Sequence, residues 1–140
     1  MHTTDTVTLG TLDAALSTYF APWVQALGLK AEAILDDGVV LRLTQNEQLS
    51  RVGSMLCGQA MMAAADTAMV LALIRHFGQF RPCTTVQLST SFLKPLSGQD
   101  VRVTARVVRV GKTMAFGEID LAGAQDGKSV CRATTTYALL

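Results

Sequence analysis

The sequence predicts an α+β domain in which one curved antiparallel sheet wraps around one long central helix. Three observations support this fold class: a long apolar segment of helical character in mid-chain, a hairpin signal before it, and four alternating strand-like segments after it. A sheet with one apolar face needs a cover, and the single long helix is the natural element to supply it. We therefore expect residues 1–140 to form one domain.

Two elements are predicted before the central helix. From Thr11 to Gln25, apolar residues recur at helical spacing, which predicts a short amphipathic helix that Pro22 ends or kinks. From Ala31 to Leu43, two apolar runs flank Asp37-Gly38, a dipeptide typical of tight turns between antiparallel strands. These residues are expected to form a β-hairpin.

The central helix is predicted from Gly53 to Phe77, with Gly78 as its C-cap. The segment is rich in Ala, Met and Leu and is apolar nearly all round, so the helix should be buried on most sides. Polar residues, including Asp66, interrupt its apolar stretch, which favours a buried helix over a membrane span.

The second half of the chain is predicted to be four strands separated by tight turns that contain glycine. The predicted strands are Thr84–Leu93, Asp100–Val110, Lys112–Leu121 and Ser129–Leu139. Long alternating strands with short turns favour an antiparallel sheet with one covered face.

The composition predicts that the chain associates with itself. Of its 140 residues, 49% are hydrophobic and 16% are charged, and the mean hydropathy is +0.32. A small domain has much surface, so this excess of apolar residues predicts that another copy covers part of it. We expect at least a homodimer and favour a tetramer made of two dimers.

Charge and cysteine content exclude several other classes. The formal net charge is +1 and the arginines are scattered, which argues against a nucleic-acid partner. Cys57, Cys83 and Cys131 are odd in number and lack CxxC spacing, so neither a disulfide framework nor a zinc site is predicted. The N-terminus lacks the pattern of a signal peptide. We expect a cytoplasmic protein without membrane attachment.

Asp66 is the first candidate for a catalytic residue. It lies in the middle of the apolar helix, where it cannot cap a helix end, and no Lys or Arg lies within four residues. An unpaired buried carboxylate is costly, so such residues are often functional. The alternative is a structural carboxylate hydrogen-bonded to Ser or Thr hydroxyls of the covering strands, and the residues alone leave both readings open.

Gly58, near the start of the same helix, is a candidate oxyanion donor, because N–H groups in a first helical turn are unpaired. Close helix packing is the more common explanation for such a glycine. Gly58 and Asp66 are eight residues apart, or about 12 Å along a helix, so they cannot both touch one carbonyl from the same chain. If both act, two helices must run antiparallel in a two-fold dimer.

Other nucleophiles have little support. The histidines are His2, near the N-terminus, and His76, which is about 28 Å along the helix from Cys57. A Cys–His pair within one chain is therefore not expected, and the same shortage of histidine argues against a Ser-His-Asp triad. Arg109, Lys112 and Thr113 flank a tight turn that is suited to a phosphorylated carrier, although solvated surface residues explain them equally well.

Several of these residues fall into a known pattern. The segment from Arg51 to Asp66 is similar to the motif Asn-x-x-Gly-x-x-His-Gly-Gly followed by an acidic residue nine positions after the His. Gly58 and Asp66 match this motif and Gly53 lies one position before its first Gly, while the Asn, the His and the second Gly are replaced by Arg51, Cys57 and Gln59. Residues 85–95 and 111–116 resemble a strand and a Gly-Lys/Arg-Thr turn of the same family. From Val24 onward the chain thus resembles the hotdog-fold acyl-CoA thioesterases, in particular the phenylacetic-acid-degradation type.

The resemblance implies a hotdog fold, a coenzyme A thioester as substrate, no cofactor, and a homo-oligomer. It implies that Asp66 acts as nucleophile or as general base on water, that Gly58 of the partner subunit polarises the thioester carbonyl, and that Thr85 positions the water or the carboxylate. The residues expected to contact substrate are Arg51, Cys57, Gln59, Arg109, Lys112 and Thr113, among which Arg51 and Gln59 offer replacement N–H donors.

Two functions follow from this pattern. The first is an acyl-CoA thioesterase that hydrolyses small aromatic or short- to medium-chain acyl groups. The second is a non-catalytic hotdog protein that binds acyl-CoA or another acyl ligand, which the replaced Asn and His favour. A third, weaker hypothesis is dehydration on the same fold, but neither histidine is well placed for it.

Overall fold

The structure is a computed structural model that describes residues 7–140 of the chain. The helices of this part are α1 (Leu9–Leu16), α2 (Pro22–Gln25) and α3 (Gly58–Phe77), with a short 3-10 helix η2 at Glu47–Leu49. The main sheet contains β1 (Lys30–Leu35), β2 (Gly38–Leu43), β5 (Cys83–Phe92), β6 (Val101–Val110), β7 (Met114–Gly123) and β8 (Ser129–Leu139). A separate small hairpin is formed by β3 (Ser50–Arg51) and β4 (Met55–Leu56).

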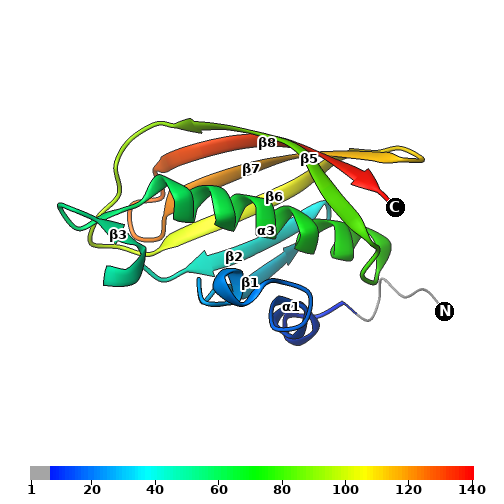
Figure 1. Ribbon diagram of the computed structural model, residues 1–140, viewed down its shortest axis with the longest axis horizontal. Coiled ribbons are helices and arrows are strands. Elements are labelled where there is room, and N and C mark those ends of the chain that lie inside the picture. Colours follow the sequence, from blue (N-terminus) through cyan, green and yellow to red (C-terminus); the bar gives the residue numbers. More distant parts are fainter. Residues whose placement is uncertain (1–6) are drawn as a thin grey trace.

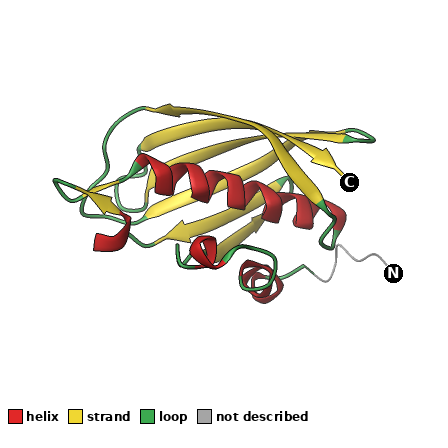
Figure 2. Ribbon diagram, in the orientation of Figure 1, coloured by secondary structure: helices red, strands yellow, loops and turns green. Residues whose placement is uncertain are grey.

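The main sheet is antiparallel throughout and curves around α3, as the sequence predicts (Figure 1). Its strand order is β1-β2-β6-β7-β8-β5, so the hairpin β1–β2 joins beside β6 and β5 is the opposite edge. The short helices α1 and α2 lie beside the β1 end of the sheet (Figure 2). The predicted α+β architecture with one long central helix is therefore confirmed.

Helix α3 is buried against the concave face of the sheet, as predicted. It is long and apolar enough to suit a membrane span by composition alone, but most of its residues are buried inside the protein. Its C-terminus is as predicted, because Gly78 adopts a left-handed conformation with φ 81° and its N–H bonds to the carbonyl of Ile74. Such a cap favours glycine, which has no Cβ to clash.

The predicted start of this helix at Gly53 is wrong, since α3 begins at Gly58. The residues before it form the β3–β4 hairpin, in which Gly53 has φ 93° and Ser54 has φ 60°. Two consecutive residues with positive φ cannot continue a right-handed helix. Cys57 then acts as the N-cap, with its sulfur accepting the Ala60 N–H at 3.4 Å.

The prediction of one continuous helix from Thr11 to Gln25 is also wrong. The chain forms α1, then a turn at residues 17–21, and then the single-turn helix α2, which Pro22 begins rather than ends. Proline at the first helical position is favourable because its missing N–H needs no partner there. The capping box between Thr8 and Thr11 explains why α1 begins earlier than predicted.

The packing of α3 on the sheet depends on a glycine in β7. A Cβ at Gly117 would lie 2.2 Å from the sulfur of Met69, so the bare backbone of β7 leaves the space that this fully buried side chain fills. Such interdigitation is how close packing is achieved in protein interiors.

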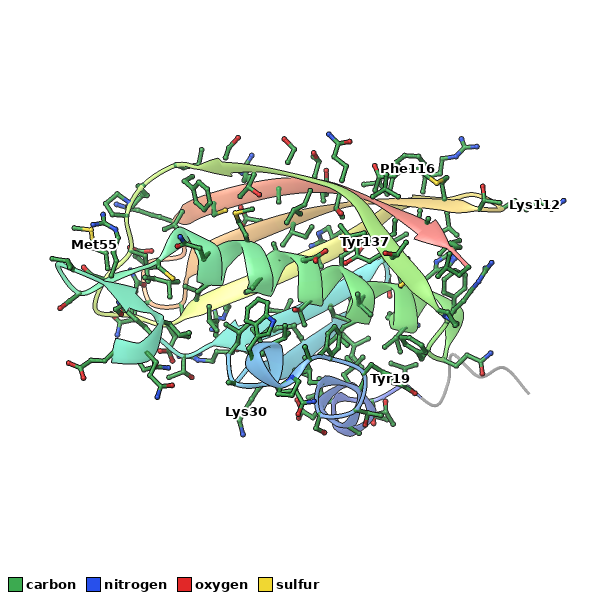
Figure 3. All side chains as sticks on the ribbon, viewed as in Figure 1. Tyr19, Lys30, Met55, Lys112, Phe116 and Tyr137 are labelled. Atoms are coloured by element: carbon green, nitrogen blue, oxygen red, sulfur yellow. The ribbon has the colours of Figure 1, made fainter. Side chains whose placement is uncertain are left out.

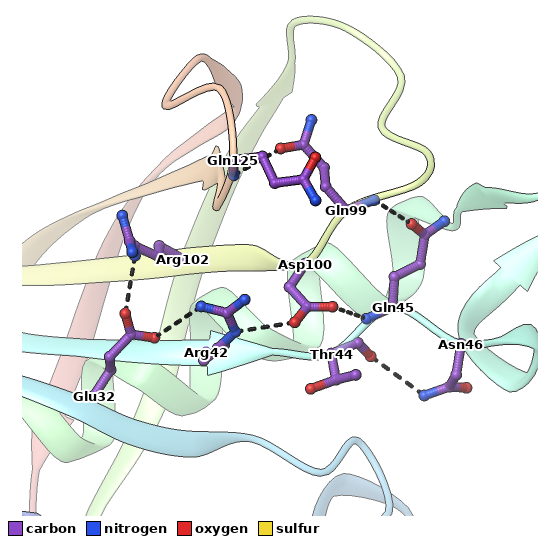
Figure 4. Close-up of polar contacts among 9 residues, drawn as sticks. All are labelled: Glu32, Arg42, Thr44, Gln45, Asn46, Gln99, Asp100, Arg102 and Gln125. Carbon is purple, nitrogen blue, oxygen red and sulfur yellow. Dashed lines mark hydrogen bonds and ion pairs between the residues drawn. The ribbon is translucent and has the colours of Figure 1, made fainter.

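The outer face of the sheet is polar and is cross-linked by ion pairs (Figure 4). Glu32 of β1 contacts Arg102 of β6 at 2.9 Å and Arg42 of β2 at 3.8 Å. Arg42 also bonds to Asp100 at 3.0 Å, and Asp100 accepts the N–H of Gln45 at 3.1 Å. These side chains are partly exposed, so each pair contributes at most about 1 kcal/mol, and the network mainly fixes the register of three strands.

Substitution of Gly38 by alanine is expected to destabilise the sheet. Gly38 pairs with Arg106, and a Cβ there would lie 1.8 Å from the carbonyl oxygen of Ala105, which belongs to the backbone and cannot move aside cheaply. We expect Gly38→Ala to lower the free energy of unfolding by about 1–3 kcal/mol, measured by urea denaturation. Gly10→Ala in α1, where the Cβ meets only ordinary contacts, is the control and should be neutral or stabilising. Equal unfolding midpoints for Gly38→Ala and wild type would contradict this prediction.

Candidate functional site

The Asp66 carboxylate is half-buried on the side of α3 that faces β5 and β8. The hydroxyl of Thr85, on the edge strand β5, donates a hydrogen bond to Oδ1 of Asp66 at 2.8 Å. This strand hydroxyl is the partner that the structural reading of Asp66 requires, yet the carboxylate also borders a cavity. The two readings of the sequence are therefore compatible: the carboxylate is held in place and remains accessible.

Tyr137 of β8 is a second partner of Asp66. Its hydroxyl contacts Oδ1 of the carboxylate and lies 2.9 Å from the backbone carbonyl oxygen of the same residue. The side chain is only 2% exposed. Burial raises the pKa of the Tyr137 phenol far above its usual value, and the neighbouring Asp66 charge raises it further, so the hydroxyl stays protonated at neutral pH.

A cavity of about 300 Å³ opens beside these three residues. Its other walls are mostly apolar and come from α2 and the turn before it, from α3, and from the segment that leads into β5. The aromatic and aliphatic lining residues are Tyr19, Phe20, Trp23, Val24, Val70 and Phe80. Tyr19 and Phe80 stack, with ring centroids 3.9 Å apart and ring planes within 7° of parallel. An apolar chamber beside an oriented carboxylate is suited to an acyl group that carries a reactive carbonyl.

Cys83 borders the same cavity. Burial raises the pKa of its thiol, and the Asp66 charge raises it further, so the thiolate needed for nucleophilic attack is disfavoured. Cys57 and His76 lie at opposite ends of α3, which keeps them from forming a pair within one chain. His2 lies outside the described residues. The structure thus leaves Asp66 as the candidate for the reacting group in this cavity.

Gly58 borders a different cavity, of about 380 Å³, at the N-terminal end of α3. A Cβ at Gly58 would lie 3.3 Å from the ring of Phe92, so the aromatic side chain covers the helix start closely. Asp66 does not line this second cavity, and Gly58 does not line the first. Within one chain the two residues therefore serve separate spaces, in keeping with their separation along the helix.

The remaining motif residues near Gly58 are differently placed. Arg51 is exposed, borders the Gly58 cavity, and points its guanidinium at the sulfur of Met55 at 3.1 Å. Gln59 is exposed in the first turn of α3 and lines neither of these two cavities.

Arg109, Lys112 and Thr113 are exposed at the β6–β7 turn and do not border the Asp66 cavity. This turn projects from the end of the molecule opposite to Met55 (Figure 3). Within a single chain, Thr85 is therefore the predicted site residue that contacts Asp66. The other predicted site residues lie away from the Asp66 cavity.

Sequence reasoning missed Tyr137 and the aromatic wall of the cavity. Tyr137 lies directly across from Thr85 in the pairing of β5 with β8, which sequence alone does not give. A signal was nevertheless present, because a phenol on the covered face of a strand needs a hydrogen-bond partner, and Asp66 is the acid of that core helix.

Comparison with known proteins places the chain in a family. Residues 55–130 match the family model described as the thioesterase superfamily. A provisionally named esterase of Saccharolobus solfataricus is 30% identical over 74% of this chain and 66% of its own length. A protein of Thermoplasma volcanium with the same kind of name is 27% identical over 69% of this chain and 72% of its own length.

Solved structures show the same fold. A mutant thioesterase from Pseudomonas aeruginosa superposes with a TM-score of 0.84 at 23% identity, covering 96% of this chain and 95% of its own. A mutant of the phenylacetic acid degradation protein PaaI from Thermus thermophilus superposes with a TM-score of 0.74 at 23% identity, covering 86% of this chain and 100% of its own. The branch within the family stays a prediction at this level of identity. The chain belongs to the thioesterase superfamily, has its hotdog fold, and is at that level a thioester hydrolase.

Proposed function

We propose that the protein is an acyl-CoA thioesterase in which Asp66 is the catalytic carboxylate. The observation that carries this proposal is the Asp66 carboxylate itself, held by the Thr85 hydroxyl at 2.8 Å and bordering an apolar cavity of about 300 Å³. Membership of the thioesterase superfamily supplies the reaction class. The cavity supplies a space for a small aromatic or short- to medium-chain acyl group.

Asp66 has two possible roles in the reaction. As a general base, it takes a proton from water while the water oxygen bonds to the thioester carbonyl carbon; the C–S bond then breaks and the proton passes to the leaving sulfur. As a nucleophile, it bonds to the carbonyl carbon itself and expels the thiolate, and water then hydrolyses the resulting anhydride. Both routes consume one water and yield the carboxylic acid and free coenzyme A.

A second subunit completes the proposed site. Gly58 and Asp66 border separate cavities, so the Gly58 N–H reaches a carbonyl beside Asp66 only if it comes from another chain. An antiparallel pair of α3 helices achieves this and gives two equivalent sites. Large apolar side chains that are exposed around α3 and β5 favour such burial: Met62, Val86, Phe92 and Leu93.

The same arrangement gives the basic turn a role. Met55 and Lys112 lie at opposite ends of the chain (Figure 3), so in an antiparallel pair the Met55 end of one chain would lie toward the Lys112 end of its partner. Arg109, Lys112 and Thr113 then lie near the Gly58 side of a shared site, where they are suited to the phosphates of the coenzyme A arm. Arg51 and Gln59 flank Gly58 and offer further N–H donors, and Cys57 orders the first turn that presents the Gly58 N–H.

Replacing Asp66 by asparagine is expected to abolish hydrolysis. Asp66→Asn keeps the shape of the side chain but removes the base or nucleophile, so kcat should fall by about 10²–10⁴-fold. Release of coenzyme A from aromatic, short-chain and medium-chain acyl-CoAs would be followed by chromatography, because the protein thiols interfere with a thiol dye. Asp36→Asn, in the exposed β1–β2 turn, is the control and should keep wild-type turnover.

Undiminished turnover in Asp66→Asn would reject Asp66 as the catalytic group. Binding of acyl-CoA without hydrolysis by the wild-type protein across the whole panel would instead favour the alternative function, a non-catalytic acyl-CoA binding protein.

Co-expression of two inactive variants tests the shared site directly. Asp66→Asn removes the carboxylate, and Gly58→Val fills the space beside the Gly58 N–H, so each homodimer should be inactive. About half of randomly mixed dimers combine the two chains, and each mixed dimer has one intact site, so about a quarter of wild-type activity should return. Light scattering of the wild type should give a mass of at least twice 14.9 kDa. No recovery of activity, or a monomeric wild type, would contradict the shared site.

A further inference from the structure

The two oxygens of the Asp66 carboxylate have different surroundings. The hydroxyls of Thr85 and Tyr137 both converge on Oδ1 from neighbouring strands. Among the described residues, none donates a hydrogen bond to Oδ2 or forms an ion pair with it, although Asp66 borders the cavity. A carboxylate with one oxygen held by two donors presents the other to whatever occupies the space beside it.

Tyr137 is well placed to fix this orientation. It is 2% exposed, lies on the strand next to β5, and pairs across from Thr85. Its hydroxyl also lies 2.9 Å from the backbone carbonyl of Asp66, so it is anchored against the helix that carries the carboxylate. Thr85, by contrast, is an exposed residue of an edge strand. The buried phenol is therefore the more rigid of the two supports.

The phenol can only donate toward the carboxylate. Burial and the Asp66 charge both raise the pKa of Tyr137, so the hydroxyl keeps its proton at neutral pH and above. A hydroxyl has one proton, which the carboxylate and the backbone carbonyl share as acceptors. The charged oxygen is the stronger acceptor, because hydrogen bonds to ionised groups are roughly twice as strong as those between neutral groups.

We infer that Tyr137 is a positioning residue that, together with Thr85, holds Oδ1 of Asp66 and thereby assigns Oδ2 as the reacting oxygen. The inference rests on the proposed function of Asp66 and holds for both of its roles. Oδ2 either takes the proton from water or bonds to the thioester carbonyl carbon, while Oδ1 keeps its two donors throughout. The Tyr137 hydroxyl takes no part in bond making or breaking, and acts by limiting rotation of the carboxylate.

A purely structural role for Tyr137 would give different kinetics. If its hydroxyl only satisfied a buried polar group, its loss would lower stability and leave turnover of the folded enzyme unchanged. If it positions Oδ2, its loss allows the carboxylate to rotate away from the attacking geometry. Small misplacements of a reacting group reduce rates by about a hundredfold without a matching loss of binding. The split between kcat and KM therefore separates the two roles.

Tyr137→Phe removes only the hydroxyl and is the central test, with phenylacetyl-CoA and octanoyl-CoA as substrates. We expect kcat to fall by about tenfold to a hundredfold and KM to stay within about twofold. Thr135→Val is the matched control: it removes a buried hydroxyl on the same strand that donates to the Gln87 carbonyl at 2.8 Å and has no contact with Asp66. Its kcat should remain that of the wild type.

Wild-type kcat in Tyr137→Phe, a rise in KM alone, or an equal loss of kcat in Thr135→Val would overturn the inference. If Tyr137→Phe does not fold, Thr85→Val tests the same contact with Oδ1 from an exposed position. A loss of kcat at constant KM would support the inference, and an unchanged kcat would overturn it. Failure of the proposed function is a separate result, seen as absence of turnover in the wild type or as turnover that survives Asp66→Asn.

Discussion

The burial of α3 in the concave face of the sheet is the constraint on which the other features depend. The helix is apolar on most sides, so the five strands that contact it must curve to cover it. A glycine in β7 must also leave space for Met69. Because everything around the helix is packed, its single carboxylate, Asp66, has to be accommodated by hydroxyls that the neighbouring strands supply. The same burial that makes a charge expensive also fixes where that charge points.

Local patterns explain why most of the fold could be predicted from the sequence. Alternating strands with glycine turns are specified by neighbouring residues, and the predicted Ser129–Leu139 strand agrees with β8 at both ends. The positions at which helices begin were harder to predict. The segment before Gly58 is apolar enough to suit a helix, but positive φ angles at Gly53 and Ser54 fold it into a hairpin, and composition does not reveal backbone dihedrals. The N-terminal helix likewise divides at a turn that apolar spacing does not mark.

The site was predictable only as far as single residues carry chemical information. Asp66 stands out as an acid in an apolar helix, and Thr85 follows from resemblance to a family. Tyr137 contacts Asp66 through the pairing of β8 with β5, a relation between residues 71 positions apart that no local pattern contains. Similarly, the roles proposed for Gly58 and for the basic turn at Lys112 require a second subunit, because one chain does not bring these residues to the Asp66 cavity.

The aromatic wall of the cavity has a consequence for how this enzyme can diversify. Tyr19 lies in the turn before α2 and Trp23 lies in α2, whereas Asp66 and Thr85 lie within the residues that match the superfamily model. The four apolar residues at positions 19–24 that form one wall of the chamber are thus separate in sequence from the part that holds Asp66. Substitutions in this wall can change the size of the chamber while the contacts of Asp66 with Thr85 and Tyr137 stay in place. One carboxylate site can then face chambers of different size through changes in a short segment that precedes β1.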